Sequence, residues 1–438
     1  MKSKRWMAAL AVSVALMAGG CAPAADSGGT ANGGGGGEVT LQMVESLTNP
    51  ARTTLLKGIL AKFEAANPGI KVNLVSPPTD QADNKIQQML QAGSGIDVLE
   101  VRDNTVGAFS TNGWLYDLAS DTKNWSGWAN LTKAAQTASF TGEAQYLIPY
   151  GFYGLSLYYR TDLIKAAGFA GPPHSWDDLY QQAKAIQDPA KNQYGYAFRG
   201  GKNANGQLAA IMEAFAADKL DPTNSFKQTA GGTLFGTSEA LDAMNFYLKL
   251  FKDASPETSV AWGYAEMVEG FNNGSTAFLL QDPEVIATIT ESTTVKADQW
   301  GTSPLPVGPT GKAFQPMAWA GWGVAKSSQH AAESVKLVQY LTSDAAIEFA
   351  KGNSMVPILA SAADDPDFKT GPWAAYVAMT TDPATYVPVT EPRTVAWWSE
   401  WQAKADADFQ KVLIGQATPA DTLKDWDAYW TEKFASQG

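Results

Sequence analysis

Residues 39–101 alternate short apolar strands with amphipathic helices, and this order strongly limits the folds open to the chain. The runs 39–44, 70–75 and 96–101 have the length and composition of buried strands, and the segments between them repeat apolar residues every three or four positions. Pro50 suits the first turn of the first helix. Strands separated by helices pair in parallel through right-handed crossovers, so we expect an α/β fold.

The length of the chain favours two such bodies. A chain of 438 residues is longer than a single hydrophobic core usually supports. The segment 194–198 (Tyr-Gly-Tyr-Ala-Phe) is typical of a strand in a second body, with helices predicted near 207–217 and 238–251. No segment repeats with a period of about 20 to 50 residues, which argues against solenoids and propellers.

The composition excludes several kinds of site. A formal charge of −12 argues against nucleic acid or anionic lipid as a partner. Cys21 is the only cysteine, so an internal disulfide cannot form. With only His174 and His330 beside it, a Cys/His metal site cannot be assembled. We therefore expect neither a metal nor a cofactor.

Residues 147–169 are interpreted as a crossing between the two bodies. Pro149 cannot donate to a β-ladder and keeps its neighbours extended. Residues 155–160 then alternate in polarity with period two, which predicts a strand. Asp162 can cap a short helix that ends at Gly168.

Three stretches resemble the linking strands of the extracellular solute-binding proteins of ABC importers, bacterial family 1, in the maltose-binding-protein-like branch for sugars and sugar alcohols. They are 147–169, 271–278 (Phe-Asn-Asn-Gly-Ser-Thr-Ala-Phe) and 352–357 (Gly-Asn-Ser-Met-Val-Pro). The resemblance implies a periplasmic-binding-protein-like α/β fold, with two discontinuous lobes, a three-strand hinge and a ligand cleft between the lobes. Lobe 1 would contain 39–150 plus 281–352, and lobe 2 would contain 151–280 plus 353–438.

The first 38 residues are expected to serve export and anchoring. The basic start and the apolar run 6–18, which is too short to span a bilayer, make residues 1–20 a predicted signal peptide. The small residues before Cys21 resemble a lipoprotein signal, although Ala18 stands where that signal usually has leucine. The resemblance implies that Cys21 is acylated and that residues 21–38 tether the protein to the outer face of the cytoplasmic membrane. The alternative is an ordinary signal peptide in which Cys21 has no role.

A sugar or polyol offers many hydroxyl groups and no charge, which determines the side chains that its site needs. Carboxylates, Arg and Asn bind hydroxyls, and aromatic faces suit C–H patches. In parallel sheets such groups meet beyond the carboxyl ends of the strands. On this basis and from the resemblance, the predicted ligand-binding residues are Glu45, Arg102, Asp103, Arg199, Asn203, Asp282, Trp319, Gly321, Trp322, Trp397 and Trp398.

These residues also have purely structural interpretations. Arg102 and Asp103 could form a salt bridge with each other on the surface. Asp282 could cap the helix that follows it. Several of the 15 tryptophans must belong to the core, and Trp319 and Trp322 are predicted to place at least one ring at the site.

The resemblance implies a lipid-anchored, monomeric substrate-binding protein without catalytic activity. It would capture a sugar, oligosaccharide or sugar alcohol by lobe closure and deliver it to ABC permease subunits. One alternative is a surface glycosidase that uses two of the carboxylates of Glu45, Asp103, Asp282 and Glu284. Another is a carbohydrate receptor that takes no part in transport.

Overall fold

The computed structural model describes residues 38–48, 50–395 and 397–436. The predicted signal peptide, Cys21 and all of the predicted tether except Glu38 lie outside these residues. Within the described ranges, no helix combines the length and the apolar composition that a membrane crossing requires.

A six-stranded sheet contains the strands predicted at the start of the chain. Its order is β14-β13-β3-β1-β2, and β6 also pairs with β13. As predicted, β1, β2 and β3 are parallel, and α1 (Pro50–Ala66) and α2 (Thr79–Ala92) connect them. The six strands are β1 (Val39–Val44), β2 (Ile70–Val75), β3 (Val98–Arg102), β6 (Ile148–Gly154), β13 (Ala313–Val324) and β14 (Tyr386–Val389).

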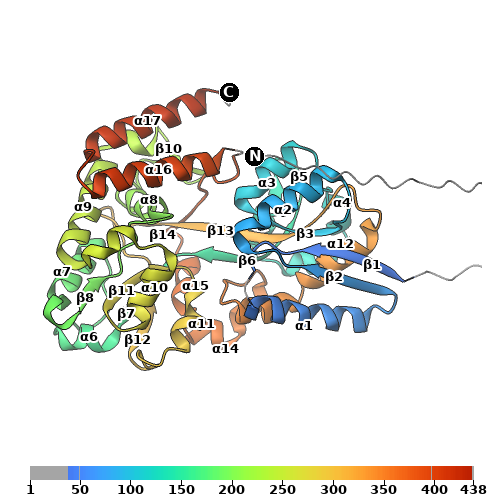
Figure 1. Ribbon diagram of the computed structural model, residues 1–438, viewed down its shortest axis with the longest axis horizontal. Coiled ribbons are helices and arrows are strands. Elements are labelled where there is room, and N and C mark those ends of the chain that lie inside the picture. Colours follow the sequence, from blue (N-terminus) through green and yellow to red (C-terminus); the bar gives the residue numbers. More distant parts are fainter. Residues whose placement is uncertain (1–37, 49, 396, 437–438) are drawn as a thin grey trace, which may run out of the picture. The chain divides into compact units, whose positions relative to one another are not determined.

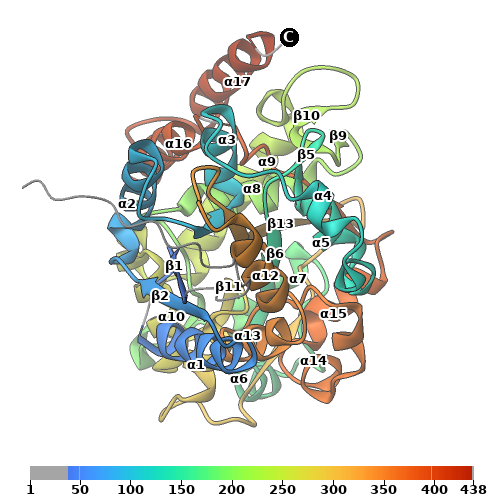
Figure 2. The ribbon, with the colours of Figure 1, turned by 90° about the vertical axis from the view of Figure 1, so that its right-hand side faces the viewer.

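Neighbouring residues of this sheet face different helices because side chains alternate along a strand. Met43 belongs to a core that includes Phe63 of α1, whereas Val44 packs in a separate core with Ile86 of α2. The helices α12 (Ala331–Leu341) and α13 (Ala345–Gly352) contact α1 and β6, and Figure 2 shows these three helices together. On the other side, α3 (Asp103–Thr111) contacts β3.

A four-stranded sheet has the order β12-β7-β11-β8. Its strands are β7 (Ser156–Arg160), β8 (Tyr194–Tyr196), β11 (Thr276–Gln281) and β12 (Trp300–Ser303). The longer helices of this part are α7 (Trp176–Ile186), α8 (Ala204–Phe215), α9 (Ser238–Ala254), α10 (Tyr264–Asn272), α15 (Ala374–Thr381), α16 (Trp398–Leu413) and α17 (Pro419–Ala435). Ser175 caps α7 by accepting a hydrogen bond of 3.1 Å from the Asp178 N–H, as its sequence predicted.

Short elements complete the described chain. The helices are α4 (Ala119–Thr122), α5 (Lys133–Ala138), α6 (Thr161–Ala166), α11 (Val285–Thr290) and α14 (Pro366–Thr370). The strands are β4 (Phe140–Thr141), β5 (Ala144–Gln145), β9 (Leu220–Asp221) and β10 (Asn224–Gln228). The 3₁₀ turns are η1 (Ser126–Asn130), η2 (Pro189–Lys191), η3 (Leu234–Gly236), η4 (Glu257–Ala261) and η5 (Ala360–Asp364).

The links between the two sheets differ from the prediction in one place. After Leu155 the chain leaves β6 in the six-stranded sheet and enters β7 in the four-stranded sheet, at the predicted crossing. At the predicted second link, β11 pairs with β7 and β8 inside the four-stranded sheet and with no strand of the six-stranded sheet. The 12-residue strand β13 makes the return, pairing in turn with β14, β6 and β3. Figure 1 shows β13 and β6 in the middle of the view, between the elements of the two sheets.

Two strands lie outside their predicted lobes. Residues 300–303 were assigned to lobe 1, yet β12 pairs with β7 of the four-stranded sheet. Residues 386–389 were assigned to lobe 2, yet β14 extends β13 of the six-stranded sheet. The third predicted link, 352–357, includes Val356, which forms a bridge with Phe152 of β6. The division of the chain into two lobes otherwise remains a prediction.

Candidate functional site

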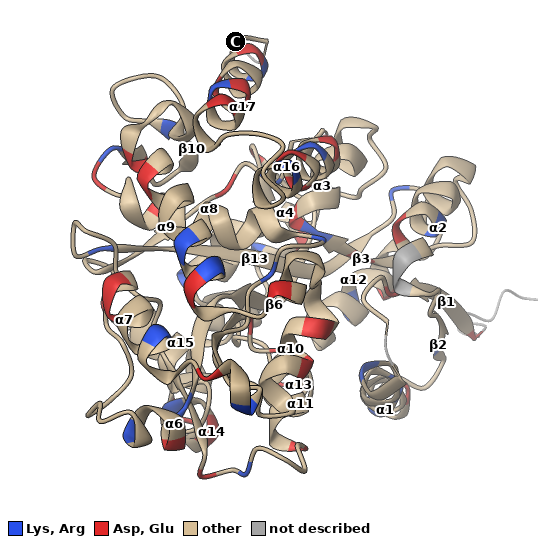
Figure 3. Ribbon diagram, turned by 60° about the vertical axis from the view of Figure 1, so that its left-hand side comes forward, with Lys and Arg blue, Asp and Glu red and all other residues tan. Residues whose placement is uncertain are grey.

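A cavity of about 260 Å³ is lined by residues from both sheets and from the segments that connect them. Arg102 and Trp319 line it from the six-stranded sheet and Asp103 lines it from the start of α3. Arg199 and Asp282 line it from the segments that follow β8 and β11. Figure 3 shows segments of both charges close to β6, β13 and α10. The cavity therefore brings together strand ends from both sheets, as expected for a ligand site of an α/β protein.

Six of the predicted residues line this cavity: Arg102, Asp103, Arg199, Asn203, Asp282 and Trp319. Asn203 lies in the left-handed conformation (φ 61°) immediately before α8, and its N–H donates to Asp406 of α16 at 2.8 Å. The Nε of Arg199 donates to the Lys202 carbonyl at 2.8 Å. Local hydrogen bonds thus hold the loop that carries both side chains, while contact with a ligand remains a prediction.

Arg102 and Asp103 do not form the mutual surface salt bridge that was their alternative interpretation. Arg102 forms its ion pair with Asp83 of α2. Burial acts to lower the pKa of Arg102, but the nearby carboxylates of Asp83 and Glu100 have the opposite and larger effect. The pKa of Arg102 is therefore raised, and the guanidinium stays charged.

Asp103 pairs instead with a distant part of the chain. Its Oδ2 lies 2.6 Å from Nε of Arg393, a residue that follows β14, and the Asp103 side chain is 7% exposed. The Nη1 of Arg393 also lies 3.5 Å from Oε2 of Glu391. This group connects the first residue of α3 to the segment between β14 and α16.

Asp282 and Glu284 form a pair of carboxyl groups at the cavity. Burial raises the pKa of Asp282 to about 6, against the opposing effects of the Glu284 N–H and the Arg199 charge. Burial, aided by the Asp282 charge, raises the pKa of Glu284 to about 8. Near neutral pH one group can therefore donate a hydrogen bond while the other accepts one. Asp282 Oδ1 also accepts from the Glu284 N–H at 3.1 Å, so it orders the turn before α11 as well.

Strand β13 separates the two predicted tryptophans. Trp319 lines the cavity, but Trp322 is fully buried with its ring centroid 5.1 Å from that of Tyr150. Trp322 lies outside the cavity lining because residues three apart on a strand leave it on opposite faces. Gly321 is also absent from the cavity lining. A Cβ there would lie 2.4 Å from the Ile148 carbonyl oxygen, so the glycine is needed for close strand packing.

Trp397 and Trp398 pack in an aromatic cluster, and neither lines this cavity. Trp398 is 3% exposed and its ring centroid lies 5.8 Å from that of Phe226. Trp397 packs 4.7 Å from Trp430 of α17. Contacts with distant elements therefore take up both rings, although the Arg393 guanidinium lies 5.9 Å from the Trp398 ring centre.

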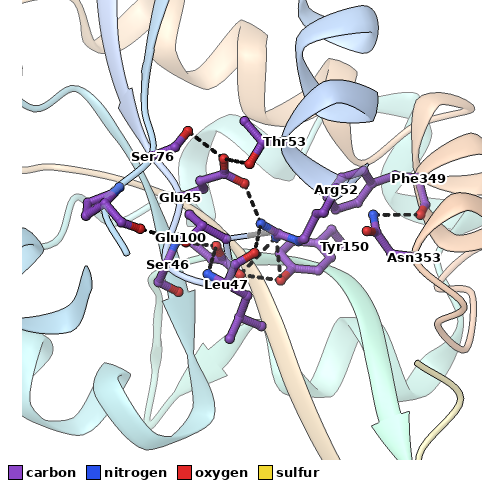
Figure 4. Close-up of polar contacts among 12 residues, drawn as sticks. Glu45, Ser46, Leu47, Arg52, Thr53, Ser76, Glu100, Tyr150, Phe349 and Asn353 are labelled. Carbon is purple, nitrogen blue, oxygen red and sulfur yellow. Dashed lines mark hydrogen bonds and ion pairs between the residues drawn. The ribbon is translucent and has the colours of Figure 1, made fainter. Parts of the chain in front are cut away.

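Glu45 does not line the cavity, and protein groups occupy its carboxylate. The side chain is fully buried, and Oε2 lies 2.6 Å from Nη1 of Arg52. The hydroxyls of Thr53 and Ser76 donate to Oε1, each at 2.6 Å. Figure 4 shows this arrangement at the start of α1.

Arg52 joins Glu45 to a second buried carboxylate. Its Nη2 lies 3.1 Å from Glu100 Oε1 and 3.1 Å from the Tyr150 hydroxyl. Glu100 Oε2 accepts hydrogen bonds from the N–H groups of Ser46 (2.6 Å) and Leu47 (3.1 Å). Since Leu47 lines the cavity, this cluster fixes one edge of the site without facing it.

Polar residues from three further regions line the cavity without having been predicted from the sequence: Gln207, Glu391, Arg393 and Gln402. Arg393 and Glu391 reach the cavity because β14 pairs with β13, a long-range contact that no local pattern indicates. Gln207 lies in the first turns of α8, and its Nε2 donates to the Leu280 carbonyl at 2.7 Å. In the described part of the chain, no group of three or more His, Cys, Asp and Glu side chains could hold a metal ion.

Comparisons with known proteins agree with this geometry. The sequence profile described as bacterial extracellular solute-binding protein matches residues 48–348. A binding protein of Brucella abortus (strain 2308) is 24% identical over 442 residues, 96% of this chain and 97% of that protein. The mannitol-binding protein of Pseudomonas aeruginosa is 25% identical over 224 residues, 49% of either chain.

A solved structure has the same fold. Maltose-bound MalE3 of T. maritima superposes with a TM-score of 0.75 at 22% identity, over 88% of this chain and 97% of that one. The likeness confirms the predicted periplasmic-binding-protein-like α/β fold.

Proposed function

Because the chain belongs to the bacterial extracellular solute-binding protein family, we propose that its cavity binds an uncharged sugar or sugar alcohol for delivery to an ABC importer. Members of this family are transport receptors and not enzymes, which removes the glycosidase alternative. The mannitol-binding relative and the maltose-bound structure support the choice of ligand class.

The charge balance of the cavity carries this proposal. Its charged lining residues are Arg102, Arg199, Arg393, Asp103, Asp282, Glu284 and Glu391. Two of the arginines already have carboxylate partners, and burial raises the pKa of Glu284 and of Glu391. Burying a charged ligand among these groups is costly unless its charge is paired. A neutral polyhydroxy ligand can bind these groups without disturbing their pairing.

The lining offers both kinds of contact that a sugar needs. Arginine forks and carboxylates make charge-assisted hydrogen bonds to hydroxyls. Trp319, which is half-buried, also lines the cavity and offers an aromatic side chain for the C–H edges of the ligand.

Binding would act through closure of the two predicted lobes. A ligand that contacts Asp103 and Trp319 on one wall and Arg199 and Asp282 on the other stabilises the arrangement in which both walls are close. The crossings at Leu155 and β13 provide the connections about which the lobes would rotate. The closed form would be the one that the permease subunits bind.

The anchor is proposed from sequence. Residues 1–20 would be removed, Cys21 acylated, and residues 21–38 would tether a monomer to the outer face of the cytoplasmic membrane. Cys21→Ser should release the protein from the membrane fraction and abolish the mass increase of acylation. Retention of the variant in the membrane would refute the anchor.

Thermal unfolding of the full-length protein in detergent tests the ligand class. The panel contains monosaccharides, disaccharides, longer oligosaccharides, sugar alcohols and, as charged comparisons, amino acids. A ligand at a hundred times its Kd adds about 2.7 kcal/mol, which raises Tm by at least about 2 °C. A shift with amino acids and none with any carbohydrate or polyol would refute the proposal.

A further inference from the structure

We propose that the cavity holds a single sugar ring or a sugar alcohol of similar size, and that the Asp103–Arg393 ion pair sets this limit by closing one side of it. The inference rests on the proposed function, since it specifies the size class of the carbohydrate.

The volume of the cavity is small for an oligosaccharide. Ligand pockets for drug-sized molecules are about 300 to 1,000 Å³, and this cavity is about 260 Å³. A single ring with its hydroxyl groups fits such a space, whereas a second ring would nearly double the volume required.

The aromatic lining also suits a short ligand. Trp319 and Tyr153 are the aromatic side chains of the cavity lining. Two other tryptophans that were predicted to bind the ligand pack against aromatic rings: Trp322 packs on Tyr150, and Trp398 packs on Phe226. A chain of several rings would need a row of such faces, whereas this lining offers two.

The Asp103–Arg393 pair joins two walls of the cavity that come from distant parts of the chain. Asp103 begins α3 directly after β3, and Arg393 follows β14. Their side-chain atoms lie 2.6 Å apart, so no ligand atom can pass between them. Both residues line the cavity, and their contact therefore forms a boundary of it.

Arg393 is held in this position from more than one direction. Glu391 lies 3.5 Å from its Nη1, and the guanidinium lies 5.9 Å from the centre of the Trp398 ring. Its side chain is 29% exposed, so the pair stands at the edge of the cavity and not deep in the core. Removing the side chain at this edge opens space toward solvent.

Isothermal titration of the full-length protein in detergent tests the limit. The ligands are glucose, mannose, mannitol, sorbitol, maltose, trehalose and maltotriose. We expect the best single-unit ligand to bind at least about tenfold more tightly than any disaccharide or trisaccharide. Arg393→Ala should reduce this preference about tenfold or more, because longer ligands can then extend past the former ion pair.

Two further variants provide a second test of the ion pair and a control. Asp103→Asn removes the charge with little change in size, and it should shift the preference in the same direction if Arg393→Ala fails to fold. Lys312→Ala is the matched control, because it breaks an exposed ion pair with Asp218 away from the cavity lining. The control should keep the wild-type preference.

The outcomes separate the two proposals. Equal or tighter binding of maltose or maltotriose by the wild type would overturn the size limit and leave carbohydrate binding intact. An unchanged preference in folded Arg393→Ala and Asp103→Asn would overturn the role of the ion pair. Absence of binding by every carbohydrate and polyol would refute the proposed function, and the size limit with it.

Discussion

Replacing Arg52 by methionine should destabilise the protein strongly, because it leaves two buried carboxylates without their cationic partner. The side chains of Glu45 and Glu100 are both 0% exposed, and that of Arg52 is 1% exposed. Solvent therefore cannot replace the lost charge. Breaking a buried ion pair by removing one partner costs about 3 to 5 kcal/mol, and we expect a loss in this range in the free energy of unfolding.

The pH dependence of this loss identifies its cause. Burial alone raises the pKa of Glu100, but Arg52, Tyr150 and the Ser46 N–H outweigh burial and lower it. A lowered pKa in the folded state contributes stability that is present above the unfolded value, about 4.3, and is lost as the pH falls through the folded value. The difference between wild type and Arg52→Met should therefore be full at neutral pH and shrink below about pH 4.

Urea unfolding at neutral and acidic pH measures both effects. Lys62→Met is a matched control on the same helix, because it breaks a pair with Glu348 whose side chains are 60% and 43% exposed. Exposed pairs contribute about 0 to 1 kcal/mol, so the control should change little. The reasoning would be refuted by a loss below about 1 kcal/mol in Arg52→Met, or by a loss of equal size at acidic pH.

Three other predictions address the cavity and its surroundings. Trp319→Ala should weaken sugar binding by about tenfold in isothermal titration, whereas Trp397→Ala should lower Tm and leave the affinity for the sugar unchanged. The reverse pattern would contradict the placement of Trp319 at the cavity and of Trp397 in the aromatic cluster. Burial raises the pKa of Glu284 to about 8, so the stability that its protonated carboxyl group contributes is present below the unfolded pKa and is lost as the pH rises through about 8. Glu284→Gln should therefore flatten the dependence of Tm on pH in the ligand-free protein between about pH 5 and 8.5. An unchanged slope would exclude this titration. Gly321→Ala should cost about 1 to 3 kcal/mol of stability, because its Cβ would meet the Ile148 carbonyl oxygen; Gly58→Ala in α1, where nothing lies within 4 Å, is the control and should be neutral or stabilising in urea unfolding.

Local patterns in the sequence predicted the elements well. The alternation of strands and helices over residues 39–101 predicted the parallel pairing of β1, β2 and β3. Ser175 predicted the start of α7 because a capping hydroxyl and an acidic first turn are local signals. Arg102 and Asp103 were placed at the cavity because they directly follow a buried strand.

The features that sequence analysis missed depend on contacts between distant segments. Trp322 and Trp398 lie in the core because Tyr150 and Phe226, which are far from them in sequence, pack against their rings. The burial of Glu45 was not predicted, because the proximity of Arg52 and Ser76 arises only from the fold. The same limit applies to Arg393, whose approach to Asp103 depends on the pairing of β14 with β13.

A crystal structure of the protein with its best-binding sugar or sugar alcohol tests the central claim most directly. We expect ligand density in the cavity, with hydroxyl groups within hydrogen-bond distance of Asp282 or Arg199 and a C–H face against Trp319. Density for the ligand elsewhere on the protein, with this cavity left to solvent, would contradict the account.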